Sequence, residues 1–233
     1  MVRPIKKKQI PNLQEAIKET TWKQIAEFGA PTLSLRAIAR ELKITAPAIY
    51  NYFPSRDDLV TALIVDAFTS LGDAQKKSVE SISANKLEAR FTALGLAYRD
   101  WAIQYEQRYQ LIFGTPIPGY EAPADTTVPA AAWALIPLME TVQALYDTDK
   151  LRVERLPKLT PALKGMLEAW QKFVRKAGSE IHIEVLYLVY IVWSRVHGLV
   201  ALEVGHQSPS FITDPGEIFR REIAMMTSQY TGE

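Results

Sequence analysis

Few side chains in this 233-residue chain are of the types that perform catalysis or bind metals. The chain has no cysteine, which excludes disulfides, thiolate metal sites and cysteine nucleophiles. Its three histidines, His182, His197 and His206, are separated by 15 and 9 residues, whereas a metal site on one helix needs spacings of about three or four. We therefore expect no metal, no cofactor and no enzymatic activity.

The adjacent carboxylates Asp57 and Asp58 look like a general acid and base, but their position suggests a structural role. They follow Ser55 in the sequence Ser-Arg-Asp-Asp, which has the spacing of a capping box at the start of a helix. Negative side chains in a first turn also interact favourably with the helix dipole. Helix capping therefore explains both carboxylates without catalysis.

The charge of the chain is divided unevenly. Residues 1–56 contain ten Lys and Arg against four Glu, a net charge of +6, whereas residues 57–233 have a net charge of −5. Such asymmetry favours a polyanionic partner at the N-terminal end. The alternative is a basic face that only contacts solvent.

Two short helical segments within the basic region have the layout of a helix-turn-helix. We expect Ser34 to cap a helix over residues 35–43 and Thr45 to cap one over residues 46–53, with a turn of four residues, 42–45, between them. Such a pair can place its second helix in the major groove of DNA. The small residues at the start of the second helix would let it approach the bases closely. Two ordinary packed helices would have the same outline.

The residues themselves are more specific than the outline. The stretch SLRAIARELKITAPAIYNYFPSRDDLVTAL, residues 34–63, resembles the DNA-binding region of the tetracycline-repressor (TetR) family, and the similarity covers about residues 14–64. The resemblance implies contacts to the DNA backbone and, for three residues, to the bases. The expected backbone contacts are Ser34, Arg36, Thr45, Tyr50, Tyr52 and Arg56; Arg36, Ala46 and Pro47 are expected to face bases.

Two positions depart from the usual pattern of the family. Lys43 stands in the turn where the family usually has glycine, so we expect a lysine in the left-handed conformation, at a cost of about 1 kcal/mol. Tyr52 stands where the family often has histidine, and its hydroxyl can still donate to a phosphate. Arg36 has an alternative role as a solvated surface charge.

Nearly all of the remaining sequence has helical periodicity, so we expect an all-α fold. A three-helix DNA-binding domain over residues 1–57 would precede a larger helical domain for effector binding and dimerisation over residues 58–233. Residues 114–127 are rich in proline and glycine and are expected to form a loop over or beside a pocket. Residues 150–159 are expected to be a charged linker. The expected helices cover residues 12–28, 35–43, 46–53, 87–105, 107–113, 128–146, 161–176 and 180–204, with others starting at Ser55 and Asp214.

The segment 180–204 is apolar on nearly all sides, which predicts a helix that is buried on all sides. One side could pack on its own domain and another on a second subunit, and the final helix would join it. This arrangement resembles the four-helix dimer interface of the TetR family. We expect a homodimer through residues 180–205 and 214–230.

Trp193, His197 and Gly198 resemble a signature that defines a Trp-His-Gly (WHG) subtype of the TetR C-terminal domain, over about residues 85–230. The family resemblance implies an apolar or aromatic effector held between these helices, and a largely apolar pocket with few polar groups suits such a ligand. Packing in the core would explain the same aromatic residues. The expected ligand-binding residues are Trp101, Tyr105, Phe113, Trp133, Tyr190, Trp193 and His197.

The sequence therefore predicts a cytoplasmic bacterial transcription regulator that binds an inverted repeat in double-stranded DNA. A repressor that a small-molecule effector releases is the expected form. The alternatives are an activator of the same fold and a helical ligand-binding protein that does not bind DNA. No uncharged run reaches the roughly 20 residues of a membrane-spanning helix, so we expect no membrane segment.

Overall fold

The computed structural model describes residues 11–176, 178 and 180–232, which form two compact units. Within this part of the chain the secondary structure is helical apart from one isolated bridge between Leu151 and Thr231, as expected for an all-α fold. The first unit contains residues 11–67 and 107–127, and the second contains residues 68–106 and 128–232. The two compact units divide after Ala67, whereas the boundary between the DNA-binding and effector-binding domains was expected after residue 57. Residue 57 lies inside a helix.

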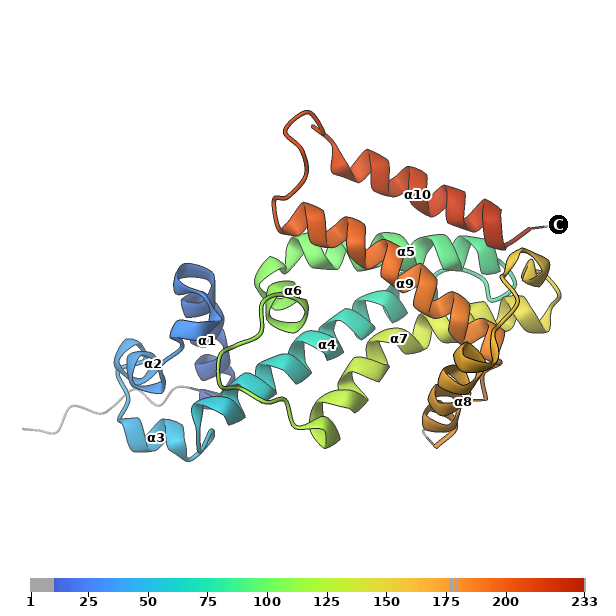
Figure 1. Cartoon of the computed structure of the whole chain (residues 1–233). Helices are drawn as coiled ribbons and strands as arrows, with labels where there is room; N and C mark the ends of the chain where they lie inside the picture. Colours follow the sequence, from blue (N-terminus) through green and yellow to red (C-terminus); the bar gives the residue numbers. More distant parts are fainter. Residues whose placement is uncertain (1–10, 177, 179, 233) are drawn as a thin grey trace, which may run out of the picture. The chain divides into compact units, whose positions relative to one another are not determined.

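The first unit is built around the N-terminal helices and the start of α4 (Figure 1). Its elements are α1 (Leu13–Phe28), the short η1 (Ala30–Thr32), α2 (Leu35–Glu41), α3 (Ala46–Tyr50), the beginning of α4 (Arg56–Glu80) and most of α6 (Glu106–Phe113). Ile17, Ile38 and Ile49 are fully buried and form its core with Leu59 and Leu63. Phe28, the last residue of α1, is not part of this core, because 60% of its surface is exposed.

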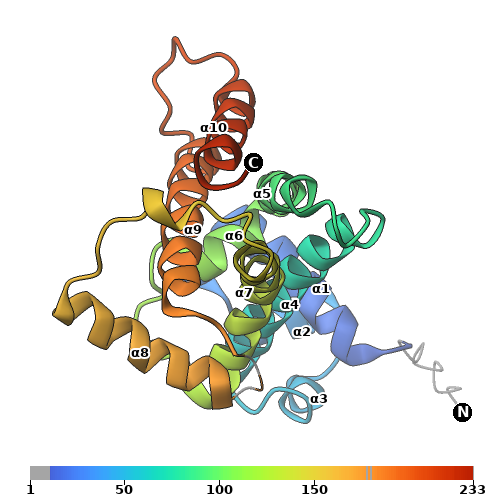
Figure 2. The same ribbon diagram turned by 90° about the vertical axis from the view of Figure 1, so that its right-hand side faces the viewer.

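Long helices form the second unit. They are the rest of α4, α5 (Leu87–Gln104), α7 (Ala124–Asp147), α8 (Pro161–Lys176), α9 (Ile183–Val204) and α10 (Pro215–Tyr230), with the short η2 (Val153–Arg155) before α8. Helices α5, α9 and α10 pack against one another, and α8 packs on α9 (Figure 2). The large side chains Leu94, Leu186 and Phe219 are fully buried among these helices.

Two expected features of the second half of the chain need correction, and a third stays a prediction. The expected loop ends earlier, because α7 begins at Ala124: the carbonyl of Pro123 accepts hydrogen bonds from the amide and hydroxyl of Thr127. In the single chain α9 is buried on one side, with Val192 and Val196 in the core, whereas 54% of Tyr190 is exposed; burial of the other side by a second subunit stays a prediction. The linker over residues 150–159 contains η2.

Helices α7 and α9 are long and apolar enough to cross a membrane, although no uncharged run in the sequence is that long. In the structure their most apolar windows are 44% and 39% buried. Helix α9 and all but the first four residues of α7 belong to the second unit, where each contributes buried side chains to the core.

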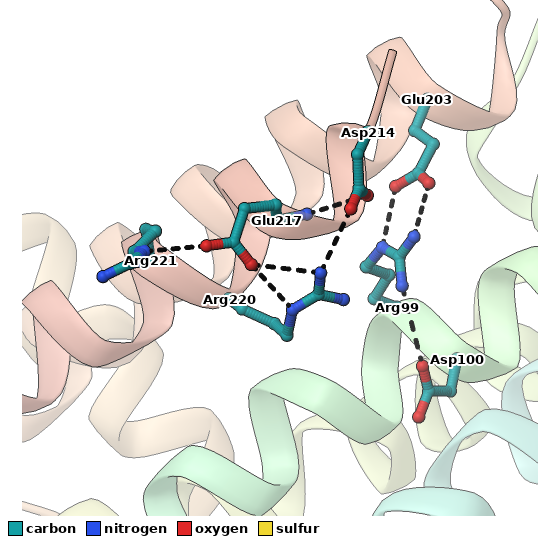
Figure 3. A network of polar contacts seen from close by, with 7 residues as sticks. All are labelled: Arg99, Asp100, Glu203, Asp214, Glu217, Arg220 and Arg221. Atoms are coloured by element: carbon teal, nitrogen blue, oxygen red, sulfur yellow. Dashed lines mark hydrogen bonds and ion pairs between the residues drawn. The ribbon is translucent and has the colours of Figure 1, made fainter. Parts of the chain in front are cut away.

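Two groups of polar contacts lie at the start of α10, one within α10 and one that joins α5 to α9 (Figure 3). The guanidinium of Arg99 donates to both carboxylate oxygens of Glu203, at 2.8 and 2.5 Å. Asp214 caps α10 by accepting from the amide of Glu217 at 3.0 Å, as expected. A side chain at Gly216 would meet Arg99, because an added Cβ would lie 2.6 Å from Nη2. The glycine therefore allows α10 to start against the Arg99–Glu203 pair.

Candidate nucleic-acid interface

Helices α2 and α3 form the predicted helix-turn-helix. Ile38 on α2 and Ile49 on α3 are both fully buried, which fixes the two helices against one another and against the rest of the first unit. The turn is closed by hydrogen bonds from the amide of Lys43 to the carbonyl of Arg40 and from the amide of Ile44 to the carbonyl of Ala39. Lys43 has a φ angle of 56°, so the lysine adopts the expected left-handed conformation.

Two of the three predicted caps in this region are present. The hydroxyl of Ser34 accepts from the amide of Ala37 at 3.4 Å. The hydroxyl of Ser55 accepts from the amide of Asp58 at 3.1 Å and donates to its carboxylate at 2.7 Å. Both short polar segments therefore start helices as the sequence predicted.

Thr45 occupies the capping position of α3 but its side chain caps nothing, which corrects the prediction. A capping side chain accepts from the second or third amide of the helix. The second residue is Pro47, which has no N–H, and the amide of Ala48 donates to the backbone carbonyl of Thr45 at 2.9 Å. The exposed hydroxyl of Thr45 is therefore left available to a partner outside the chain.

The residues predicted to contact DNA lie largely on the surface of the first unit. Tyr50 and Tyr52 are 44% and 46% exposed, which is unusual for large aromatic side chains beside a buried core. Arg36 is exposed and forms no ion pair with any residue that the structure describes. Thr45 and Pro47 are also exposed, and Ser34, Ala46 and Arg56 are half-buried. The arrangement presents hydroxyls and a guanidinium beside a short helix with small residues at its start.

Arg56 has protein partners as well. Its guanidinium donates to the carbonyl of Pro31 at 3.3 Å and lies 3.7 Å from the carboxylate of Asp57. These contacts join the start of α4 to η1. A phosphate contact by Arg56 stays a prediction. The contacts to Pro31 and Asp57 would hold its side chain in place before DNA binds.

Several contacts that support this surface were not predicted from the sequence. The ammonium of Lys18 on α1 lies 2.7 Å from carboxylates of both Glu15 and Asp66. Burial lowers the pKa of Lys18, but the hydrogen bonds to Asp66 and Glu15 outweigh it and raise the pKa above its ordinary value. The guanidinium of Arg108 on α6 lies 5.5 Å from the ring centre of Trp22 on α1. Glu15 and Lys18 are three residues apart on one helix, but Lys18–Asp66 and Arg108–Trp22 join segments far apart in the chain, so no local pattern could have found those two pairs.

Several of the aromatic residues predicted to bind an effector contact one another in the second unit. On α9, the ring of Trp193 stacks on that of His197 at 5.3 Å, and Tyr190 lies 6.2 Å from Trp193. On α5, Trp101 and Tyr105 lie 6.1 Å apart.

The other two expected ligand-binding residues have different surroundings. Trp133 on α7 donates to the carboxylate of Asp73 on α4 at 3.1 Å, and the ammonium of Lys76 lies over its ring. Phe113 belongs to the first unit, where its ring is 5.2 Å from that of Tyr109. Ligand contacts by all seven residues stay predictions.

His197 provides a polar group among these aromatic rings. Its Nδ1 lies 3.1 Å from the hydroxyl of Tyr98 on α5, and burial lowers the pKa of the imidazole below its ordinary value. The ring is therefore neutral near pH 7. No group of three or more His, Asp or Glu side chains within the described residues is arranged to hold a metal ion.

Comparison with known proteins supports these observations. Residues 17–63 match the family model described as "Bacterial regulatory proteins, tetR family", and residues 91–226 match "Tetracyclin repressor-like, C-terminal domain". The HTH-type transcriptional regulator Rv1816 of Mycobacterium tuberculosis is 30% identical over 217 residues, which cover 93% of this chain and 91% of that protein.

Solved structures share the fold as well. The regulatory protein SCO4313 is 31% identical with a TM-score of 0.73, and the match covers 93% of this chain and 98% of that one. A TetR protein from Acinetobacter baumannii, solved in complex with minocycline, is 13% identical with a TM-score of 0.53, over 94% of this chain and 96% of that one. The family models and the mycobacterial relative span both the helix-turn-helix and the larger helical unit. The chain therefore belongs to the TetR family of DNA-binding transcription regulators.

Proposed function

We propose that this chain is a cytoplasmic transcriptional repressor that binds an inverted-repeat operator as a homodimer and leaves it when a small, largely apolar effector binds. The main support is the surface of α3, where the hydroxyls of Thr45 and Tyr50 are exposed and Thr45 is not used as a cap. Hydroxyls beside a helix start are suitable donors to DNA phosphates.

Selection of bound fragments from the native genome would test the operator. We expect fragments that share an inverted repeat with half-sites about one helical turn apart. A reporter gene placed behind that repeat should be silenced by the protein. Increased expression would instead identify an activator, and the absence of any enriched sequence would argue for a ligand-binding protein that does not read DNA.

The outer face of α9 and α10 supports the homodimer. A groove of about 650 Å³ runs between these helices; the apolar side chains Leu199, Ile218 and Met225 line it together with the charged side chains Arg195, Glu217, Arg221 and Glu222. Ile218 and Met225 are 44% and 54% exposed, and an added Cβ at Gly198 would meet nothing within 4 Å in the single chain. A second copy would cover these apolar groups.

Light scattering at micromolar concentration would test the dimer. The unchanged chain should have twice the monomer mass, and Gly198→Leu should produce monomers by filling the groove. Gly165→Leu on α8 is the matched control, since that position is also open. Replacing Val192 or Val196 is less informative, because both are buried in the single chain and their loss would damage folding.

The contacts among Tyr190, Trp193 and His197 support the effector site. They combine apolar rings with one neutral imidazole, which suits a small aromatic ligand. The minocycline complex of the Acinetobacter baumannii protein has the same fold and holds a multi-ring ligand. Trp193→Ala and His197→Ala should impair release from the operator by an effector. A folded variant whose ligand-free DNA affinity changes instead would contradict this role.

A further inference from the structure

The recognition segment carries no positive charge of its own. Residues 44–53, which contain the whole of α3, have neither lysine nor arginine. Proteins hold duplex DNA largely by neutralising its phosphates with Lys and Arg, so cations that border the segment must supply this attraction. Lys43 directly precedes the segment, and Arg36 and Arg40 lie earlier on α2.

Lys43 is held in a backbone conformation that does not suit a lysine. Its φ of 56° lies in the left-handed region, which glycine adopts freely and where a residue with a Cβ is strained. The amides of Lys43 and Ile44 donate to carbonyls of α2, which closes the turn and holds the backbone of Lys43 in this conformation. Strain of this kind is concentrated at functional sites. A glycine would form the same turn with less strain, so the turn itself does not explain the lysine.

The side chain of Lys43 is exposed and makes no ion pair with any residue in the described part of the chain. Arg40 differs, because it lines a groove beside α1 together with the carboxylates of Glu27 and Glu41. Lys43 is two residues before Thr45, whose side chain is exposed and does not cap α3.

We infer that Lys43 binds a phosphate of the DNA backbone, and that the left-handed turn places its ammonium beside the start of α3. The inference rests on the proposed DNA binding and adds a contact that a glycine at this position could not make. It gives the uncharged recognition segment a cation at its border. A lysine suits this task because its ammonium acts as a mobile point charge at the end of a flexible stem.

Salt-dependent binding to a mixed-sequence duplex of about 30 base pairs tests the inference, because a phosphate contact acts on all sequences. Fluorescence anisotropy would compare the unchanged protein with Lys43→Gln, Lys43→Gly and Lys43→Arg between about 50 and 200 mM salt. Lys77→Gln is the matched control, since it removes one exposed charge from the second unit.

Each Lys43 that touches the duplex should contribute about 0.9 to the log–log slope of affinity against salt. We expect the slope to fall by that amount per bound subunit in Lys43→Gln and Lys43→Gly, and to stay unchanged in Lys43→Arg and Lys77→Gln. Melting would confirm folding, and Lys43→Gly should melt about 2 °C higher because the strain is relieved.

An unchanged slope in folded Lys43→Gln, beside a steep slope for the unchanged protein, would overturn the inference. An equal fall in Lys77→Gln would also overturn it, because overall charge would then explain the effect. If the unchanged protein showed no salt-dependent binding to any duplex, the proposed function would fail, and this inference would fail with it.

Discussion

The hydroxyl of Tyr98 on α5 and Nδ1 of His197 on α9 lie 3.1 Å apart and share a hydrogen bond. Because burial lowers the pKa of His197 in the folded protein, the unfolded chain binds a proton more readily. Stability should therefore be complete above the ordinary histidine pKa of about 6.5 and decline as the pH falls below it.

Urea unfolding at fixed protein concentration, at pH 7.5 and pH 5.5, checks this expectation. The unchanged protein should be less stable at the lower pH, and His197→Gln should show a smaller decline because the titrating group is gone. An equal decline in both proteins would assign the pH dependence to other groups.

The close contact between α4 and α7 predicts the effect of a larger side chain at Gly72, and Gly165 on α8 is the control. A Cβ added at Gly72 would overlap the indole of Trp133, and Gln75 holds the same helices together by donating to the carbonyl of Ala134 at 2.6 Å. Gly72→Ala should therefore destabilise the protein by about 1–3 kcal/mol. Gly165→Ala, in an open helical position, should stabilise it by about 0.5–1 kcal/mol. If Gly72→Ala also stabilised the protein, α4 and α7 could not approach one another as closely at Gly72 as the structure shows.

The pairing of Arg99 with Glu203 gives a prediction for the start of α10. Both side chains are largely buried, so Glu203→Gln would leave the Arg99 guanidinium with only the more distant carboxylate of Asp100, 3.9 Å away, at a cost of about 1.5–3 kcal/mol. Hydrogen bonds from Arg221 and Arg220 lower the pKa of Glu217, but Glu217 is fully exposed, so Glu217→Gln should change stability little. Chemical denaturation of the two variants would check the contrast. An equal loss of stability in the two variants would show that burial does not strengthen the ion pair between Arg99 and Glu203.

Replacing Arg36 tests whether this side chain recognises the base sequence of the operator. If its guanidinium contacts a base, Arg36→Ala should cost about 1–3 kcal/mol and relax specificity at one position in each half-site. If it contacts a phosphate, the loss should be the same for all sequences and the salt slope should fall. Binding to a set of operator variants distinguishes these outcomes. Unchanged affinity and slope would reduce Arg36 to a solvated surface charge.

Local sequence patterns predicted much of the fold because their causes are local. Helical periodicity located the helices, and the caps at Ser34, Ser55 and Asp214 follow from hydrogen bonds within one turn. The left-handed Lys43 was predicted from the resemblance to the TetR family, which usually has glycine there. The failed cap at Thr45 is also local: Pro47 and the backbone bond of Ala48 leave no amide for it.

Contacts between distant segments could not be predicted in the same way. Periodicity identifies an apolar face but not the neighbour that covers it, so it could not show that Val192 and Val196 are buried within the single chain while Tyr190 on the same helix is exposed. It also gave no reason to group α6 with the N-terminal helices, where Arg108 lies over Trp22. Charge and family resemblance identified the DNA-binding surface, but only the structure shows which of its polar groups already have partners.

The hydroxyl of Thr45 offers the most direct test of DNA binding by this helix-turn-helix, because the structure gives it no role in folding. Thr45→Val keeps the shape of the side chain and removes only the donor. Operator affinity and urea stability should be measured together, with Ser34→Ala as a control that removes a true cap and should cost about 1 kcal/mol of stability. We predict that Thr45→Val keeps the stability of the unchanged protein and binds the operator about 1 kcal/mol more weakly per half-site. Full affinity with unchanged stability would contradict the proposal that this face of α3 binds DNA.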